Sequence, residues 1–296
     1  MGTTPTGRLR RAAVAVAAVA GVVTTTSCTD GSNSAVDAPA SSSAADSGTY
    51  LALGDSVPFG YRGGATADFP DAKNFLGYPE LVGDELGLDV LNASCPGETT
   101  ASFLDATAQS NGCENTLDGP VGYRTSYPLH VQYDSVTQSQ LDYAVQTLSE
   151  KDVDLVTLQI GANDAFLCQR TTPSGCSTAE DLQSVGRTVQ NNLDRILTTL
   201  RNDAGYSGQI VVVTYYGLDY ADPTAVAIQA LDNGIEQIAE RYAADVADGF
   251  AAFKPAADAA GGDSVAAGLV LPNDVHPTPE GQQVLADAVT AVVDQS

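Results

Sequence analysis

The stretch that decides the fold is Tyr50–Tyr61, YLALGDSVPFGY. Its first four residues form a short apolar run that predicts a buried strand, and Gly54 allows a sharp turn directly after it. In an open α/β sheet, ligands bind in the crevice outside the carboxyl ends of the strands. Ser56 would lie at such an end, which makes it a candidate nucleophile.

The tetrapeptide GDSV occurs a second time, at Gly262–Val265. This copy follows AADAAGG, a segment without a strand pattern that is typical of a loop. We therefore expect Ser264 to be a solvated loop serine, and only Ser56 to lie at the end of a strand.

Apolar runs alternate with helical patterns along the rest of the chain. Strands are predicted at 50–53, 89–93, 153–160 and 209–216, with a weak one at 245–250. Helices are predicted at 78–86, 139–148, 177–200, 223–244 and 279–293, the long one opened by a capping box of Ser177 and Glu180 and the last one capped by Thr278. This order predicts a mostly parallel, about five-stranded sheet with helices on both faces.

Ester hydrolysis by a serine needs a hydroxyl, a base within hydrogen-bond reach, and donors for the oxygen that becomes negative. The chain has two histidines. His276 lies on a loop just before the last helix and is the better candidate base. His130 lies in the irregular segment 110–133, which we expect to cross the rim of the site, and is more typical of a packing or surface residue.

The expected donors are the backbone N–H groups of Ser56 and Gly97 and the side-chain amide of Asn163. Gly97 and Asn163 each follow a predicted strand, so both would reach the same edge of the sheet as Ser56. The alternatives are an ordinary turn glycine for Gly97, and a helix N-cap or an Asx-turn for Asn163.

Four ordered segments resemble the conserved blocks of the SGNH (GDSL-type) hydrolase family: GDSV at 54–57, NASCPGETT around Gly97, GAND at 161–164 and NDVHP at 273–277. The resemblance spans residues 50–293 and is strongest to secreted actinobacterial members. It implies a flavodoxin-like α/β/α fold and ester hydrolysis by Ser56 and His276. It also implies an oxyanion hole of Ser56, Gly97 and Asn163.

One position departs from the family pattern. The third catalytic member is usually an aspartate three residues before the histidine, and here that position is Asn273, with Asp274 following it. We expect Asn273 or its backbone carbonyl to orient His276 in a working dyad, so that Asp274→Ala keeps most of kcat. The alternative is that the loop shifts and Asp274 reaches the imidazole.

The first 27 residues have the pattern of an export signal, with a basic start followed by the apolar run 12–23, which is too short to span a bilayer. Cys28 follows in a context that resembles a lipoprotein signal, which predicts lipidation of Cys28, a flexible Ser/Ala-rich tether over 28–48 and a hydrolase domain over 49–296. Ordinary cleavage nearby is the alternative, because Thr25 replaces the usual aliphatic residue. The protein is expected at the outer face of the cell membrane or secreted.

Four cysteines remain after Cys28, an even number that fits an oxidising compartment. Neighbours in the sequence are expected to pair, Cys95 with Cys113 and Cys168 with Cys176, and buried free thiols are the alternative. Because the chain has no CxxC motif and only two histidines, we expect neither a metal nor another cofactor.

The chain is strongly acidic, with a formal charge of −24 over 296 residues. Without the three arginines of the leader, 10 basic residues face 37 acidic ones, which gives −27. Such a surface repels nucleic acid and does not attract anionic lipid head groups. We expect a monomer that acts on small-molecule or lipid esters.

The sequence thus predicts an exported serine esterase or lipase that forms an acyl-enzyme on Ser56. A carbohydrate O-deacetylase of the same fold is one alternative. A non-catalytic surface-binding lipoprotein is another, suggested by Asn273. The acyl chain and the alcohol part of the substrate stay open.

Overall fold

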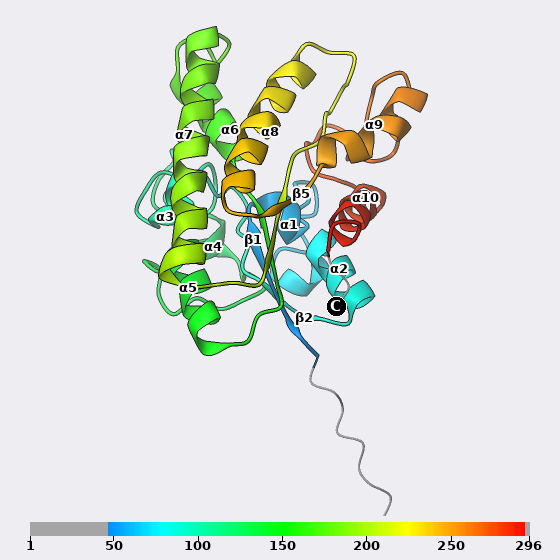
Figure 1. Cartoon of the computed structure of the whole chain (residues 1–296). Helices are drawn as coiled ribbons and strands as arrows, with labels where there is room; N and C mark the ends of the chain where they lie inside the picture. The colour runs from blue at the N-terminus through cyan, green and yellow to red at the C-terminus, as the bar shows by residue number, and fades with distance from the viewer. Residues whose placement is uncertain (1–46, 294–296) are drawn as a thin grey trace, which may run out of the picture. The chain divides into compact units, whose positions relative to one another are not determined.

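The protein is represented by a computed structural model that describes residues 47–293 (Figure 1). The predicted export signal, Cys28 and almost all of the predicted tether lie outside the described residues. Within 47–293, no helix is both long and apolar enough to cross a bilayer.

A five-stranded parallel sheet forms the centre of the domain. Its strands are β1 (Thr49–Gly54), β2 (Asp89–Asn92), β3 (Leu155–Gln159), β4 (Gln209–Val213) and β5 (Asp245–Ala247). They lie in the order β2-β1-β3-β4-β5, and every neighbouring pair is parallel. This order confirms the predicted flavodoxin-like sheet and places the topological switch point between β1 and β3.

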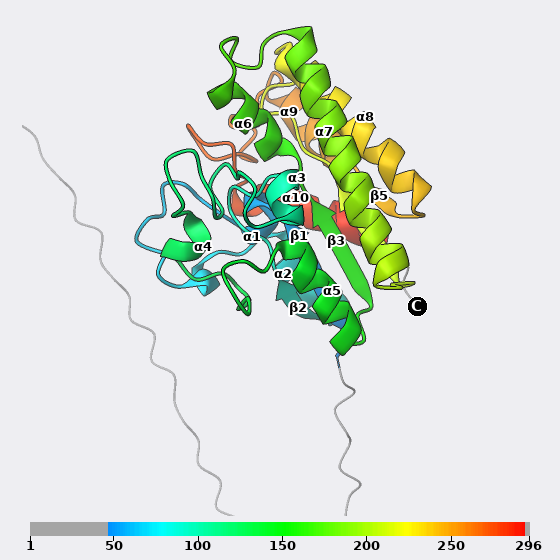
Figure 2. The ribbon, with the colours of Figure 1, turned by 90° about the vertical axis from the view of Figure 1, so that its left-hand side faces the viewer.

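Helices cover both faces of the sheet. One face carries α5 (Gln140–Glu150), α7 (Ala179–Thr198) and α8 (Thr224–Arg241), and Figure 2 views this layer with β3 behind it. The other face carries α2 (Tyr78–Leu86), α9 (Gly249–Ala259) and α10 (Pro279–Thr290) (Figure 1). The central strands β1 and β3 are almost wholly buried, as a parallel sheet between two helical layers requires.

Several short helices were not predicted: α1 (Ser56–Phe59), α3 (Thr100–Leu104), α4 (Tyr123–Ser126) and α6 (Ala162–Thr171). The predicted loop before the second GDSV was wrong, because α9 continues to Ala259, capped by Asp248 and built largely of alanine, the strongest helix former. The N-cap of α7 is Thr178, one residue after the expected Ser177, because the Thr178 side chain accepts the capping hydrogen bond from the Asp181 N–H.

The long helix α7 packs only part of its predicted apolar stripe. Val189, Leu193 and Ile196 are fully buried, whereas Leu182, near the start of the helix, is 43% exposed. The first turns of α7 therefore extend beyond the core, which ends where the sheet below them ends (Figure 2).

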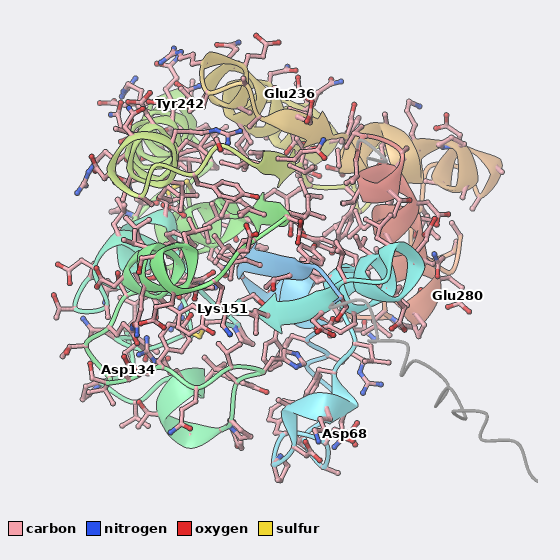
Figure 3. All side chains as sticks on the ribbon, turned by 60° about the horizontal axis from the view of Figure 1, so that its bottom comes forward. Asp68, Asp134, Lys151, Glu236, Tyr242 and Glu280 are labelled. Carbon is pink, nitrogen blue, oxygen red and sulfur yellow. A yellow bond between two sulfur atoms is a disulfide. The ribbon has the colours of Figure 1, made fainter. Side chains whose placement is uncertain are left out.

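A second, smaller apolar cluster lies beside the main core. Its buried members are Phe59, Phe69, Ala72, Phe75 and Tyr123, and Tyr61 packs against them. The labelled acidic side chains, by contrast, lie at the periphery (Figure 3). The cluster stabilises the loops next to the carboxyl end of β1, where the site described below lies.

Candidate active site

The turn after β1 places Ser56 at the carboxyl edge of the sheet. Gly54 has a φ of +140°, and a Cβ there would come within 2.1 Å of the Gln159 carbonyl oxygen. Asp55 then caps α1, because its carboxylate accepts a hydrogen bond from the Val57 N–H at 3.0 Å. Ser56 is the first helical residue, so its N–H has no partner within the helix and is free to bind an anion.

His276 contacts Ser56 from the opposite end of the chain, with 2.8 Å between its Nε2 and the serine Oγ. Its loop is held by a bridge between Val270 and Pro277, and by a hydrogen bond from the Tyr216 hydroxyl to the Val275 carbonyl at 2.7 Å. Thr278 caps α10 directly afterwards, as predicted. The loop that carries the imidazole is therefore held in place on both sides of His276.

Asp274, rather than Asn273, is the partner of His276. Its Oδ1 lies 2.5 Å from His276 Nδ1. The expectation that Asn273 orients the histidine is wrong, because Asn273 is exposed and sits at a φ of +58° in a turn closed by the Asp274 N–H and the Leu271 carbonyl. Asparagine tolerates this left-handed conformation, and the turn carries the Asp274 carboxylate to the imidazole.

The Asp274 carboxylate is held in its charged form. Burial alone would raise its pKa, but the hydrogen bond and charge of His276 outweigh burial, and the N–H groups of Val275 and Gly63 add to them, so that the pKa falls to about 2. A carboxylate can only accept, so Nδ1 carries the proton and Nε2 is left to accept the Ser56 hydroxyl hydrogen. This is the protonation pattern that a histidine base needs.

Gly97 and Asn163 lie beside Ser56 and line the same cavity. Gly97 occupies a turn that the Glu98 N–H closes onto the Cys95 carbonyl at 3.1 Å, with a φ of +84°. Asn163 is the second residue of α6, so it is not an N-cap, and its Nδ2 donates to Asp55 at 3.3 Å. The structure therefore brings the predicted serine, base and donors together.

Asp55 is a part of the site that sequence reasoning missed, although it lies within GDSV. Its Oδ2 accepts hydrogen bonds from the Tyr215 hydroxyl at 2.6 Å and from Asn163. Burial raises the pKa of Asp55 to about 6, and the hydrogen bonds from Tyr215 and Val57 partly offset that rise. Above about pH 6 the carboxylate orients the Asn163 amide. The only signal for this role in the sequence is the position of an aspartate directly after the β1 segment.

A cavity of about 420 Å³ opens over these groups. Besides the residues already described, it is lined by aromatic and apolar side chains and by a few polar ones: Tyr61, Pro96, Asn111, Gly112, Tyr123, Phe166, Gln169, Arg170 and Val275. The Tyr61 ring meets the His276 ring edge to face, at 4.9 Å between centroids. Sequence reasoning did not single out these lining residues, since they come from four loops and from the two helices α4 and α6.

Both predicted disulfides are confirmed, Cys95–Cys113 and Cys168–Cys176. The first joins the Gly97 turn to the irregular segment, and the second lies at the end of α6. Cys95, Cys113 and Glu98 are also the one group among residues 47–293 with the spacing of metal ligands. Because both sulfurs are bonded to each other, neither is available as a thiolate ligand.

The second histidine has a packing role, as expected. The His130 ring packs at a tilt against that of Phe59 with 4.6 Å between ring centroids, and its Nε2 lies 3.1 Å from the Phe59 carbonyl oxygen. Burial lowers its pKa. It belongs to the wall of the aromatic cluster rather than to the groups around Ser56.

A serine, a histidine and an aspartate in hydrogen-bonded sequence at the switch point of a parallel sheet define a serine hydrolase-type site. The comparison with known families agrees, since the model of the GDSL-like lipase/acylhydrolase family matches residues 52–284. The chain belongs to this family, which makes it a carboxylic ester hydrolase.

Solved structures of similar fold include phospholipase A1 from Streptomyces albidoflavus, with 20% identity over 83% of this chain and 100% of that one and a TM-score of 0.51. An acetylxylan esterase from Geobacillus stearothermophilus has 20% identity over 82% and 94% of the two chains and a TM-score of 0.52. An α/β hydrolase enzyme from the metagenome of Lake Arreo has 17% identity over 83% and 94%, with a TM-score of 0.51. No curated protein sequence matches the chain.

Proposed function

We propose that this chain is an exported serine esterase or lipase that hydrolyses carboxylic esters through an acyl-enzyme on Ser56. The observation that carries the proposal is the unbroken contact from Ser56 Oγ to His276 Nε2 at 2.8 Å and from His276 Nδ1 to Asp274 Oδ1 at 2.5 Å. It replaces the dyad expected from the sequence by a triad.

In the acylation step, Ser56 Oγ attacks the ester carbonyl carbon while its proton passes to His276 Nε2. The imidazolium that forms is stabilised by the Asp274 carboxylate. The carbonyl oxygen becomes negative and accepts hydrogen bonds from the backbone N–H groups of Ser56 and Gly97 and from the Asn163 amide. His276 then gives the proton to the leaving alcohol as the C–O bond breaks.

In the deacylation step, water takes the place of the alcohol. His276 removes a proton from the water, which attacks the acyl carbon, and the proton returns to Ser56 Oγ as the carboxylic acid leaves. The same donors stabilise the second tetrahedral intermediate. Each step is balanced by one proton that moves onto and off Nε2.

The cavity favours neutral esters with an apolar part. Its walls include the aromatic rings of Tyr61, Tyr123 and Phe166 together with Val275, and Arg170 is its single cationic residue. A cleft with apolar walls and few polar groups suits an acyl chain better than an acetylated polysaccharide. The phospholipase and acetylxylan esterase of similar fold show that this fold accommodates both kinds of substrate. The length of the acyl chain that the enzyme accepts therefore decides between an esterase or lipase and an O-deacetylase.

The decisive experiment compares Ser56→Ala with Ser264→Ala on p-nitrophenyl esters of increasing acyl length. Ser56→Ala is expected to lower kcat/KM about 10⁴-fold or more. Ser264→Ala removes the serine of the other GDSV copy and is expected to stay within about twofold of the wild type. Retained activity in Ser56→Ala would reject the proposal. Turnover of acetyl esters alone would favour the O-deacetylase.

The proposed location rests on the leader pattern and on two disulfides, which form in oxidising compartments. Cys28 would carry the lipid, and the protein would act as a tethered monomer. We expect Cys28→Ala to move the mature protein from the membrane fraction to the medium, with esterase activity unchanged. Release of the wild type itself into the medium would contradict lipidation and leave secretion.

A further inference from the structure

Asn111 touches both of the donor groups that lie beside Ser56. Its backbone N–H donates to the Gly97 carbonyl at 2.8 Å, and its side-chain Nδ2 donates to Asn163 Oδ1 at 2.9 Å. It lies in the irregular segment, two residues before Cys113, whose disulfide partner Cys95 lies two residues before Gly97. The disulfide therefore holds Asn111 against the Gly97 turn.

The contact with Gly97 fixes a backbone turn. Gly97 has a positive φ, and a Cβ at this position would lie 2.4 Å from Gly112 Cα, so the two backbones are in direct contact. The bond from Asn111 holds the outer side of the turn, while its inner side is held by the bond from Cys95 N–H to the Gly54 carbonyl at 3.1 Å. The Gly97 N–H donates to no group among residues 47–293, so it is left for a ligand.

The contact with Asn163 fixes the orientation of an amide. A primary amide has one oxygen and two N–H groups. Asn111 takes the oxygen of Asn163, and the buried Asp55 carboxylate takes one N–H. The second N–H is left over, and it belongs to a side chain that lines the cavity. If the Asn163 amide were flipped, its oxygen would face the Asp55 carboxylate and the negative oxygen of the intermediate, and both contacts would be repulsive.

The orientation of Asn111 itself is set by Arg170. The guanidinium Nη1 donates to Asn111 Oδ1 at 3.3 Å, which leaves the Asn111 Nδ2 for Asn163. Arg170 is anchored in turn by Asp118 at 2.9 Å. The chain of contacts from Arg170 through Asn111 and Asn163 to Asp55 thus has one consistent assignment of donors and acceptors.

We propose that Asn111 is a positioning residue of the oxyanion hole, which aligns the Gly97 N–H through its backbone and the Asn163 amide through its side chain. The inference rests on the proposed function, because it assigns Gly97 and Asn163 as donors to the reacting carbonyl. Asn111 does not act on the substrate itself. Its effect is exerted in the transition state, where the negative charge develops.

The test uses the full chain with Asn111→Asp and Asn111→Ala, and with Asn115→Asp as a control. Asn115 lies in the same segment, and its Nδ2 donates to the Thr107 carbonyl at 2.9 Å, away from both donors. Loss of a whole oxyanion donor costs about 10²–10³ in kcat, so misalignment is expected to lower kcat about 10–100-fold in Asn111→Asp, with KM within about twofold. Asn111→Ala should show a smaller loss, and Asn115→Asp none.

Two further readouts separate positioning from a general structural effect. Affinity for a trifluoromethyl ketone, which forms a tetrahedral adduct, should fall by the same factor as kcat/KM. In an Asn163→Ala background, Asn111→Asp should lower kcat by less than about threefold, because its target is gone. Unchanged kcat in both Asn111 variants, or equal losses in the two backgrounds, would overturn the inference while the wild type stays an esterase. A wild type without ester turnover would overturn the proposed function and the inference with it.

Discussion

The two copies of GDSV have the same local geometry and different surroundings. In both, the glycine has a positive φ, +140° at Gly54 and +102° at Gly262. In both, the aspartate accepts a hydrogen bond from the N–H two residues later, at 3.0 Å for Asp55 and 2.8 Å for Asp263. The tetrapeptide thus specifies a turn by itself, whichever part of the chain it stands in.

The serines of the two copies face different groups. Ser56 Oγ lies against an imidazole, whereas the Ser264 hydroxyl donates to the Gly217 carbonyl at 2.6 Å. Ser264 is fully buried, so the expectation of a solvated serine was wrong. The comparison teaches that the strand before the turn and the loop facing it decide the chemistry, because they bring His276 to one hydroxyl and a backbone acceptor to the other.

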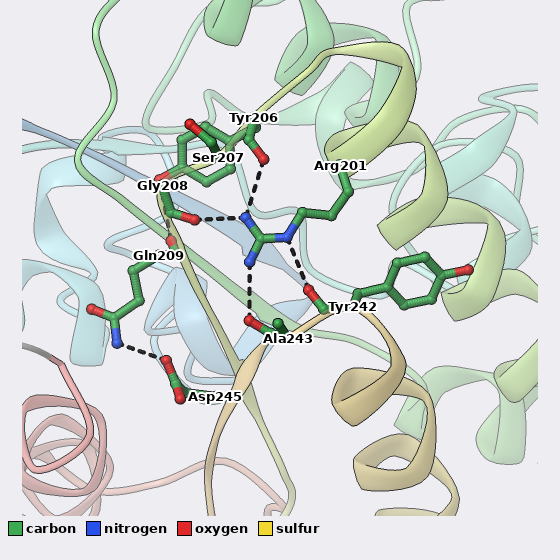
Figure 4. Close-up of a pocket in the computed structure, with 8 residues that line it drawn as sticks. All are labelled: Arg201, Tyr206, Ser207, Gly208, Gln209, Tyr242, Ala243 and Asp245. Carbon is green, nitrogen blue, oxygen red and sulfur yellow. Dashed lines mark hydrogen bonds between the residues drawn. The ribbon is translucent and has the colours of Figure 1, made fainter.

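A second contrast concerns two cavities at opposite ends of the strands. The larger, of about 540 Å³, lies at the start of β4 and β5 and contains Arg201 (Figure 4). The guanidinium donates to four backbone carbonyls, of Tyr206, Gly208, Tyr242 and Ala243. This cation is satisfied and clamps the two strand starts. The smaller cavity has unused N–H donors, so it is the one suited to bind an anionic intermediate.

After the loss of Ser56 itself, the largest effect is expected from removing the carboxylate of Asp274, which has no counterpart at the second copy. Asp274→Asn should lower kcat about 10³–10⁴-fold, because an amide no longer fixes the Nδ1–H tautomer or stabilises the imidazolium. Asn273→Gly is the control, since glycine keeps the positive φ of the turn and removes the side chain. Steady-state kinetics of both variants decide the point, and a large loss in Asn273→Gly with none in Asp274→Asn would restore the dyad.

The next effect concerns stability and pH. Burial raises the pKa of six carboxyls, to about 6 for Asp55 and Asp164, about 7 for Glu80 and Glu98 and about 8 for Asp232, and it also raises that of Glu236. A raised pKa means that the folded protein binds more protons than the unfolded chain between the two pKa values. The stabilisation is complete below the unfolded pKa and is lost as pH rises through the folded one. The melting temperature should therefore fall between about pH 5 and pH 8.

A comparison of Asp55→Asn with Asp263→Asn isolates the contribution of the first GDSV copy to the pH dependence of stability. A pKa of about 6 in place of 3.8 corresponds to a loss of about 3 kcal/mol of unfolding free energy as pH rises from below 3.8 to above 6. Asp55→Asn should remove this part of the slope, whereas Asp263→Asn, at an exposed turn, should leave the slope as it is. Equal slopes in all three proteins, measured by denaturant unfolding at several pH values, would show that Asp55 does not titrate as described.

The smallest effect is expected at the second copy. Ser264→Ala removes the hydroxyl that donates to the Gly217 carbonyl and leaves a buried acceptor without its partner, at a cost of about 1–2 kcal/mol. Ser184→Ala, at an exposed position of α7, should change stability little. Chemical denaturation gives both values. If Ser264→Ala were as stable as the wild type, the hydroxyl of the second copy would have no structural role.

Much of the fold could be predicted from the sequence, because strand runs, caps and turn residues act locally. The five strands and the helices α2, α5, α7 and α8 follow from apolar periodicity, and Thr278 and Pro279 mark the start of α10. Helix α9 was missed, since the segment AADAAGG, without a strand pattern and with two glycines, was interpreted as a loop. In the structure Pro255 lies within the helix.

The site was predictable where a residue follows a strand or precedes the last helix. Ser56, Gly97 and Asn163 were placed by the first rule, and His276 by the second. Asp274 was kept only as the alternative because the expected spacing pointed to Asn273, and the turn at Asn273 is what brings Asp274 to the imidazole. Asn111 and Tyr215 could not be found, since their contacts with Asn163 and Asp55 join segments 52 and 160 residues apart.

The central claim is that the surroundings of the first GDSV make Ser56, and not Ser264, a nucleophile. The most direct measurement treats the folded protein with a fluorophosphonate and locates the adduct by peptide mass spectrometry. The account predicts one adduct, on Ser56, that disappears in Ser56→Ala and is strongly slowed in Asp274→Asn. An unlabelled wild type, or an adduct on Ser264 or any other serine, would contradict it.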